Sequence, residues 1–313
     1  MPHLSFLFIC LVWGASFILM DRASHALGPV SIAVCRLLGG ALVLAICWRW
    51  NAQRVRLRRV DWGHILVVAV LANALPFVIQ PYSMIQAGEH AYFGMMVALV
   101  PLATILVSIP MLNLWPTRRQ LVGVLGGIVC MALAIQDGSA RGISPGLLAL
   151  ALTVPLSYAF GNAYVKWKLD HLPALPMTTL FLALGGTMLL PLALQPAILA
   201  QWKLADPAVP YDWPLAIASI IFLSGVGTGI AILLFVKLIK NQGPLFAGMV
   251  TYVVPVLALF WGQYDKEMLT STQLFAIGGV LAMVALVQWG AATPSPTLPT
   301  KKPVETMPGE SSR

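Results

Sequence analysis

The chain of 313 residues is 59% hydrophobic and only 10% charged, with a net charge of +8. Soluble domains carry about a quarter of their residues as charged side chains, so this composition excludes an ordinary soluble protein and indicates an integral membrane protein. The basic residues lie between apolar runs, which predicts membrane orientation and no nucleic-acid partner. The four cysteines all lie in apolar segments and form no CxxC pair, so we expect neither disulfides nor a metal site.

Ten apolar segments approach the length of about 20 residues that a helix needs to cross a bilayer. In chain order they are residues 4–20, 29–48, 62–81, 90–110, 118–136, 145–165, 174–195, 214–236, 244–263 and 273–289. The first lacks a basic leader, so we interpret it as a retained span and not as a signal peptide. Residues 291–313 are rich in Pro, Thr and Ser and predict a disordered cytoplasmic tail.

The basic residues predict the orientation of these spans. With ten spans, 14 of the 19 Lys and Arg residues fall on the side of the N-terminus and only Arg22, Arg141, Lys203 and Lys266 on the other. Cytoplasmic loops carry the excess of Lys and Arg. We therefore expect a multi-pass protein of the plasma (inner) membrane with both termini in the cytoplasm.

Two of the spans share a pattern. "GMMVALVPLA" begins at Gly94 and "GMVTYVVPVLA" at Gly248, and each is followed by Thr-x-x-Gln-Leu and a Gly pair, from Thr117 and Thr270. This predicts two five-helix repeats, residues 1–140 and 141–290, which enter the membrane from opposite sides because five is odd. Chance similarity between Leu/Val-rich helices is the alternative, which the shared order and spacing disfavour. Inverted repeats are typical of secondary transporters.

Three further stretches carry a family resemblance: "WGASF" from Trp13, "AVCRLLGGALVL" around Arg36, and "GTGIAILLFVKLIKNQGPLFAGMVTYVVPVLALFWGQ" from Gly227. With them the chain resembles the EamA family of the drug/metabolite transporter superfamily up to about residue 290. The resemblance implies an all-α membrane protein of ten helices in two inverted repeats. It also implies a central cavity formed by helices 1, 3, 4, 6, 8 and 9, and export or exchange of small metabolites such as amino acids. Many relatives carry Gly-Glu before helices 5 and 10, where this chain has "LWPTRRQ" and "QYDKEMLTSTQ".

Polar and aromatic residues form a stripe on each of three spans. Residues 13, 16 and 20, residues 73, 76 and 80, and residues 155, 158 and 162 follow the i, i+3, i+7 spacing that places side chains on one helix face. Such residues are costly in lipid and usually face a cavity or a neighbouring helix. Our candidates for lining a substrate cavity are Trp13, Ser16, Asn73, Gln80, Tyr82, Tyr92, Tyr158, Asn162 and Tyr252. Hydrogen bonding that only joins the helices is the alternative.

The repeated prolines, Pro101 and Pro255, lie in the middle of their predicted spans. Proline has no N–H, so the carbonyls of Val97 and Thr251 lose their helical partners. In lipid such a carbonyl requires another donor or cavity water. We therefore predict kinks beside the transport pathway, or kinks that serve packing alone.

Three ionisable residues remain at or near membrane depth. Arg36 lies well inside helix 2, where it either binds a substrate carboxylate or has a structural role. Glu89 and His90 begin helix 4 on the outer side and are our candidates for proton coupling, although a carboxylate at a helix start is also favoured by the helix dipole.

The chain contains no Walker A loop, HExxH motif or nucleophile elbow, so we expect no enzyme and no cofactor. The predicted function is secondary transport by alternating access. The predicted partners are a small-molecule substrate and the lipid bilayer, in a monomer or homodimer. A non-transporting accessory or assembly subunit is the alternative, but it leaves the inverted repeat unexplained.

Overall fold

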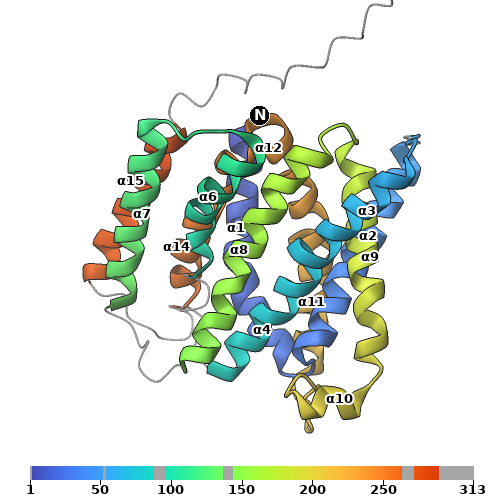
Figure 1. Ribbon diagram of the computed structural model, residues 1–313. Helices are drawn as coiled ribbons and strands as arrows, with labels where there is room; N and C mark the ends of the chain where they lie inside the picture. Colours follow the sequence, from blue (N-terminus) through green and yellow to red (C-terminus); the bar gives the residue numbers. More distant parts are fainter. Residues whose placement is uncertain (1, 52–53, 88–95, 137–143, 263–270, 289–313) are drawn as a thin grey trace, which may run out of the picture.

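The computed structural model describes residues 2–51, 54–87, 96–136, 144–262 and 271–288, and these ranges are helical apart from short connections (Figure 1). The first predicted half contains α1 (Pro2–Ser24), α2 (Pro29–Asn51), α3 (Arg59–Val67), η1 (Val68–Ala74), α4 (Leu75–Ala87), η2 (Val97–Leu99), α6 (Val100–Leu112) and α7 (Arg118–Gln136). The second contains α8 (Pro145–Lys168), α9 (Ala174–Ala193), α10 (Pro196–Gln201), α11 (Trp213–Phe222), η3 (Leu223–Ile230), α12 (Ala231–Gln242), α13 (Pro244–Gly248), α14 (Val250–Gly262) and α15 (Ser271–Gln288).

The described helices confirm the prediction of an all-helical multi-pass membrane protein. Six of them are both long and apolar enough to cross a bilayer: Pro2–Ser24, Pro29–Asn51, Arg59–Gln86, Pro145–Lys168, Ala174–Ala193 and Trp213–Gln242. The other predicted spans coincide with shorter helices or with α7, and the short α10 lies in a predicted linker. The ten-helix, two-repeat arrangement therefore stays a prediction, and the predicted tail lies outside the described residues.

Two of the long helices widen into π-helix halfway along. The helix from Arg59 to Ala87 contains η1, and the helix from Trp213 to Gln242 contains η3. The interval between their first residues, Val68 and Leu223, differs by one residue from the interval between Gly94 and Gly248. The two π segments therefore lie at matching positions of the predicted repeats. A π turn is uncommon, and it leaves backbone groups that need other partners.

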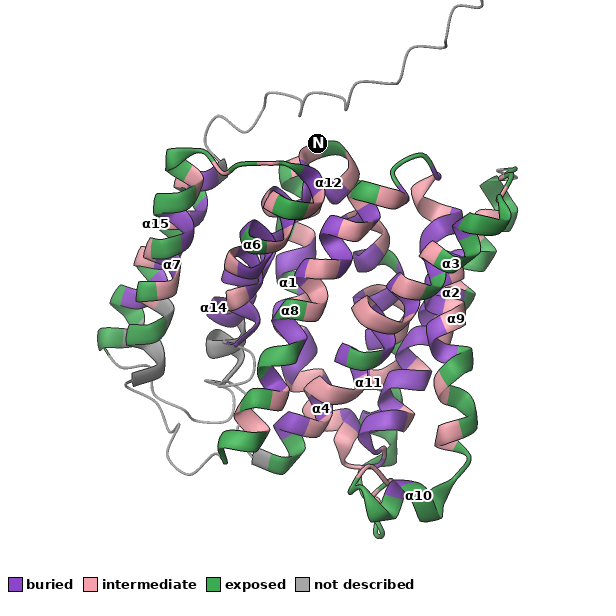
Figure 2. Ribbon diagram, viewed as in Figure 1, coloured by how far each residue is buried: buried purple, intermediate pink, exposed green. Residues whose placement is uncertain are grey.

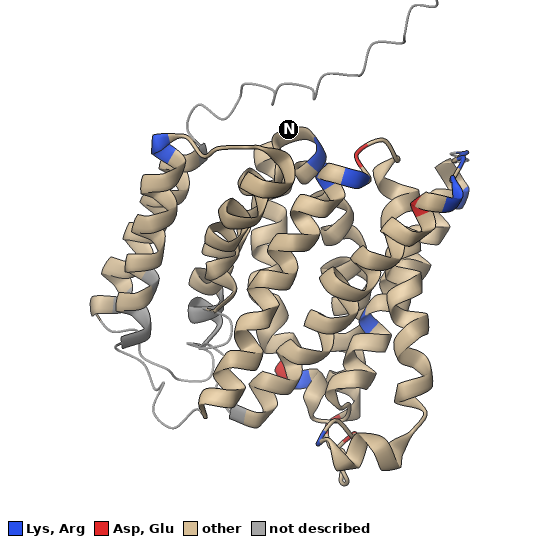
Figure 3. Cartoon of the chain, viewed as in Figure 1, with Lys and Arg blue, Asp and Glu red and all other residues tan. Residues whose placement is uncertain are grey.

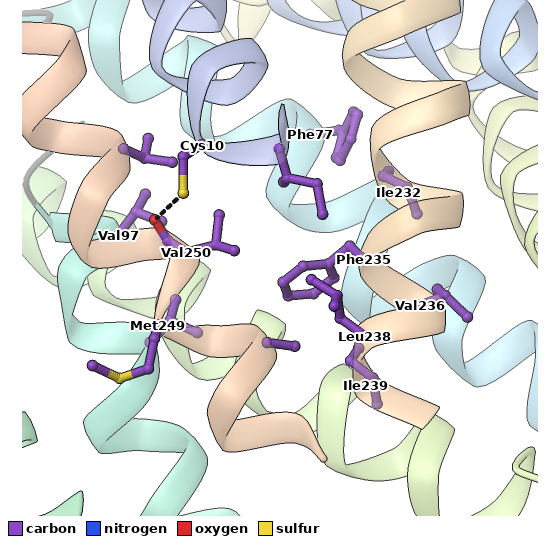
Figure 4. Packing of buried hydrophobic residues seen from close by; sticks show 14 of the residues in the cluster. Cys10, Phe77, Val97, Ile232, Phe235, Val236, Leu238, Ile239, Met249 and Val250 are labelled. Carbon is purple, nitrogen blue, oxygen red and sulfur yellow. Dashed lines mark hydrogen bonds between the residues drawn. The ribbon is translucent and has the colours of Figure 1, made fainter. Parts of the chain in front are cut away.

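The buried residues lie mainly where the helices face one another (Figure 2), and they form an apolar core. Many of the exposed residues are large apolar ones as well. Cys10 of α1 points to the carbonyl of Val250 in α14, within the same apolar cluster as Phe77 and Phe235 (Figure 4). Leu4, Leu7 and Leu11 form an exposed stripe on the other face of α1. An outer surface of this kind is suited to lipid.

The predicted halves are interleaved. α1 packs along α14, α2 along α9, and α7 along α15. α7 and α15 form a pair at one edge of the bundle (Figure 1). Glycines allow the close approaches: Gly123 faces Val287 of α15, and Gly127 faces the ring of Tyr252 in α14. The Gly123/Gly127 pair thus serves packing within the chain, as expected for small residues between membrane helices.

Basic residues gather at the end of the bundle where the N-terminus lies (Figure 3). At this end Asp61 of α3 is fully buried and pairs with Arg58 at 3.1 Å and with His171, in the connection between α8 and α9, at 3.2 Å. Lys240, near the end of α12, donates to the carbonyl of Leu169 at 3.1 Å and lies 3.5 Å from the Asp170 carboxylate. The contact of Asp61 with His171 joins the two predicted halves, whereas the contacts of Lys240 join α12 to the connection between α8 and α9 within the second.

We expect Gly161→Ala to destabilise the fold, because a methyl group at this position of α8 would overlap the Cβ atom of Ala72 in η1. Overpacking of this kind costs about 1–3 kcal/mol. Gly146→Ala is the matched control, since Gly146 lies in the same helix and no atom lies within 4 Å of the place that its added methyl group would take. Thermal denaturation of the purified protein in detergent should show a lower midpoint for the first variant only. Equal midpoints would contradict this close contact of α8 with η1.

Candidate transport cavity

A cavity of about 110 Å³ lies in the middle of the bundle. Its walls come from α1, η1 and α4, η2 and α6, α8, α12 and α14, which are the helices that the family resemblance implies, joined by α2 and α9. Both predicted halves therefore contribute to it. Among the described residues, no group of three or more His, Cys, Asp or Glu could hold a metal ion.

Most of the predicted stripe residues meet in this cavity. The structure brings together Trp13, Ser16, Met20, Asn73, Gln80, Tyr158 and Asn162 in its wall. Tyr158 donates a hydrogen bond to Oε1 of Gln80 at 3.4 Å and so joins α8 to α4. Ser16 and Asn73 instead donate within their own helices, to the carbonyls of Val12 and Val68, both at 2.9 Å.

The remaining aromatic candidates lie elsewhere. Tyr82 is not among the described residues of the wall, and Tyr252 is fully buried away from it, with its hydroxyl donating to the Val124 carbonyl of α7 at 2.7 Å. Tyr252 thus holds α14 to α7. Tyr92, together with the coupling candidates Glu89 and His90, lies outside the described residues.

Thr251, Phe77 and Phe235 also line the wall, although their sequence pattern did not predict them as cavity residues. Thr251 precedes Tyr252, and we selected the aromatic neighbour. A signal was present, since Thr251 lies four residues before Pro255 on the same helix face. Phe77 and Phe235 were indistinguishable from core residues by sequence.

The repeated proline segments contribute matching positions to the wall. Val97 and Val100 lie four and one residues before Pro101, and Thr251 and Val254 lie four and one before Pro255; all four line the cavity. The prolines themselves are buried behind them.

The local geometry differs between the two copies. The 3₁₀ turn η2 precedes Pro101, which therefore lies in the first turn of α6 and not in the middle of a regular helix, and the Val97 carbonyl accepts from the N–H of Val100. Pro255 lies inside α14, whose start is separated from α13 at Met249. A helix irregularity thus precedes the proline in both copies, two residues before Pro101 and six residues before Pro255.

Side chains from other helices donate hydrogen bonds to a backbone carbonyl of each π segment. Trp13 of α1 donates from Nε1 to the Gly227 carbonyl of η3 at 2.9 Å, and Ser157 of α8 donates to the Leu71 carbonyl of η1. Each bond connects a helix of one predicted half to the π segment of the other. Trp13 therefore has a hydrogen-bonding role in the wall as well as an aromatic surface.

Arg36 of α2 is the one charged side chain among the described wall residues, and it is buried. Its Nε donates to the Thr228 hydroxyl of η3 at 3.2 Å, and its Nη1 lies 3.1 Å from the sulfur of Met20. The guanidinium carbon lies 4.3 Å from the centre of the Phe77 ring, a cation–π geometry. The side chain thus faces the interior of the bundle and does not extend to the membrane surface.

A helical bundle with apolar outer faces and a central cavity lined by helices of both predicted halves is the architecture of a multi-pass membrane protein. The sequence matches the EamA-like transporter family over residues 1–136 and again over 145–289. The chain therefore belongs to the EamA-like transporter family.

Individual relatives agree with this assignment. The chain is 24% identical to the Bacillus subtilis protein called uncharacterized transporter YvbV, over 90% of this chain and 89% of the relative. It is 26% identical to the Escherichia coli protein called uncharacterized inner membrane transporter YedA, over 90% and 88%. A crystal structure that is 15% identical superposes with a TM-score of 0.73 over 93% of this chain and 97% of the other, which is a likeness of fold.

We expect Trp13→Phe to destabilise the wall, because it keeps an aromatic ring but leaves the Gly227 carbonyl without its indole donor. Leaving a buried acceptor unpaired costs about 1–3 kcal/mol. Trp62→Phe is the matched control, since Trp62 is exposed on α3. The midpoint of thermal denaturation should fall for Trp13→Phe only. Equal midpoints in the two variants would mean that this hydrogen bond does not support η3.

Proposed function

We propose that this protein is a secondary transporter that exports or exchanges small organic metabolites, such as amino acids, by alternating access around the central cavity. The observation that carries the proposal is the composition of the wall. Residues at positions four and one before each repeated proline line it, as do residues of both π-containing helices. A site shared by two inverted repeats near the middle of the membrane is typical of secondary transporters.

Two inverted repeats of five helices, residues 1–140 and 141–290, are part of this proposal. The family match in two segments, 1–136 and 145–289, supports it. So do the matching positions of η1 and η3. The hydrogen bonds of Trp13 and Ser157 across the halves, and the contact of Asp61 with His171, are contacts that a rocking of one half against the other would have to rearrange.

The first test is solute counterflow in proteoliposomes. We expect liposomes loaded with unlabelled amino acids or aromatic acids to take up the labelled compounds without nucleotide, above the level of protein-free liposomes. Thr251→Phe should reduce this uptake at least tenfold because it fills the cavity, whereas Leu281→Phe, on an exposed face of α15, should not. An absolute requirement for ATP would refute the proposal. If no compound showed counterflow and other proteins co-purified with this one, the result would favour an accessory subunit.

The same liposomes test the coupling candidates. If Glu89 and His90 couple transport to protons, a pH gradient across the membrane should change wild-type uptake and leave Glu89→Gln uptake unchanged. A variant that responds like the wild type between about pH 6 and 8, where an ordinary histidine titrates, would exclude this pair and favour facilitated diffusion or exchange.

We further propose an inner-membrane location with both termini in the cytoplasm, in keeping with the name of YedA and the excess of basic residues at one end of the bundle (Figure 3). Lys203 follows α10 and Arg56 precedes α3, which lie toward opposite ends of the bundle (Figure 1), and both residues are exposed. In a variant lacking Cys10, Cys35, Cys47 and Cys130, an impermeant thiol reagent added to intact cells should label a cysteine at position 203 but not at position 56. Reversed labelling would refute this orientation.

A further inference from the structure

We infer that Arg36 is the anion-binding residue of the cavity, and that the solute is an organic monoanion with a carboxylate-like group at one end and an apolar body. This inference rests on the proposed function, since it takes the cavity as the site of transport. It adds the chemical class of the solute and the residue that selects it.

The charge in the cavity is unbalanced among the described residues. Arg36 is 6% exposed, and no acidic side chain of the described wall or ion pair of the described residues neutralises it. Its polar contacts are a hydroxyl and a thioether, and its aromatic contact is the Phe77 ring. A buried cation without an anion is costly, so a bound anion would be stabilised here more than a neutral solute of the same shape.

Hydrogen-bond donors in the wall are also in excess. A guanidinium has five N–H groups in a planar fork that matches a carboxylate. In the described residues only Nε and Nη1 have partners, which leaves Nη2 for a ligand. Asn162 is 7% exposed, lines the same cavity, and its Nδ2 is without a hydrogen-bond partner among the described residues. Unpaired donors of this kind require an acceptor.

The rest of the wall is apolar and indicates the shape of the remaining solute. Phe17, Phe181 and Phe235 line the cavity together with aliphatic residues of α8 and α12. A carboxylate held by Arg36 would leave the body of the solute against these side chains. If the solute carried polar groups over its whole length, those groups would find no hydrogen-bond partners in this wall. Burying them would cost free energy and weaken binding.

The test compares three probes of nearly equal shape: phenylacetate, its neutral isostere phenylacetamide, and the cation 2-phenylethylamine. Binding of radiolabelled phenylacetate to the purified full-length protein is measured, with the other two as competitors. We expect phenylacetate to bind at least tenfold more tightly than phenylacetamide, a difference of about 1.4 kcal/mol, and the amine to compete least.

The variant Arg36→Gln should remove the preference for the anion and leave phenylacetamide binding within a few-fold of wild type. Arg36→Lys should keep part of it, because an ammonium retains the charge but lacks the planar fork. Arg49→Gln is the matched control, since it removes one positive charge from the exposed end of the same helix and should leave the preference unchanged.

Two results would overturn the inference: phenylacetamide that binds wild type as tightly as phenylacetate, or no phenylacetate binding at millimolar concentration. Both are measured on the wild type, so they hold even where Arg36→Gln does not fold. A folded Arg36→Gln that keeps its anion preference would overturn it too. Anion binding that depends on Arg36 without any counterflow would refute the proposed function alone. Counterflow of neutral solutes that survives Arg36→Gln would refute this inference alone.

Discussion

The hydrogen bonding of backbone carbonyls within an apolar surrounding is the constraint on which the rest of this structure depends. A regular α-helix meets it by itself, whereas η1 and η3 interrupt the regular ladder of helical hydrogen bonds. Two of their carbonyls, at Leu71 and Gly227, accept hydrogen bonds from Ser157 and Trp13, which belong to helices of the opposite predicted halves. The hydrogen bonds that the π segments accept therefore also join the two predicted halves beside the cavity.

Close contacts between helix backbones lie next to the cavity. In lipid the hydrophobic effect does little to hold helices together, so close approach of their backbones matters more. Gly161 lies against Ala72, and Gly40 lies against Gly229, which brings α8 to η1 and α2 to η3. Other residues of the wall, such as Phe77 and Tyr158, are larger than these glycines and alanines. The cavity lies between such larger side chains.

Arg36 connects the fold with the chemistry of the cavity. It lies on α2, and its partners come from α1, α4 and η3. The same side chain therefore contacts η3, which the glycine contact also brings close to α2. The cation–π contact with Phe77 and the contact with the Met20 sulfur position the guanidinium without neutralising its charge. A hydrophobic residue of similar size would pack at less cost, which is why a charge at this position points to a task beyond stability.

The sequence alone determined the membrane class, the helix positions, and most of the stripe residues in the wall. Long apolar runs can only be helices in lipid, and the helical period then assigns Trp13, Asn73 and Asn162 to defined faces. Only the tertiary structure decided between Thr251 and Tyr252, because adjacent residues point about 100° apart and α7 supplies the acceptor that takes Tyr252 away from the cavity. It alone revealed the π segments, because their carbonyls accept from donors on helices distant in the sequence, which no local pattern shows.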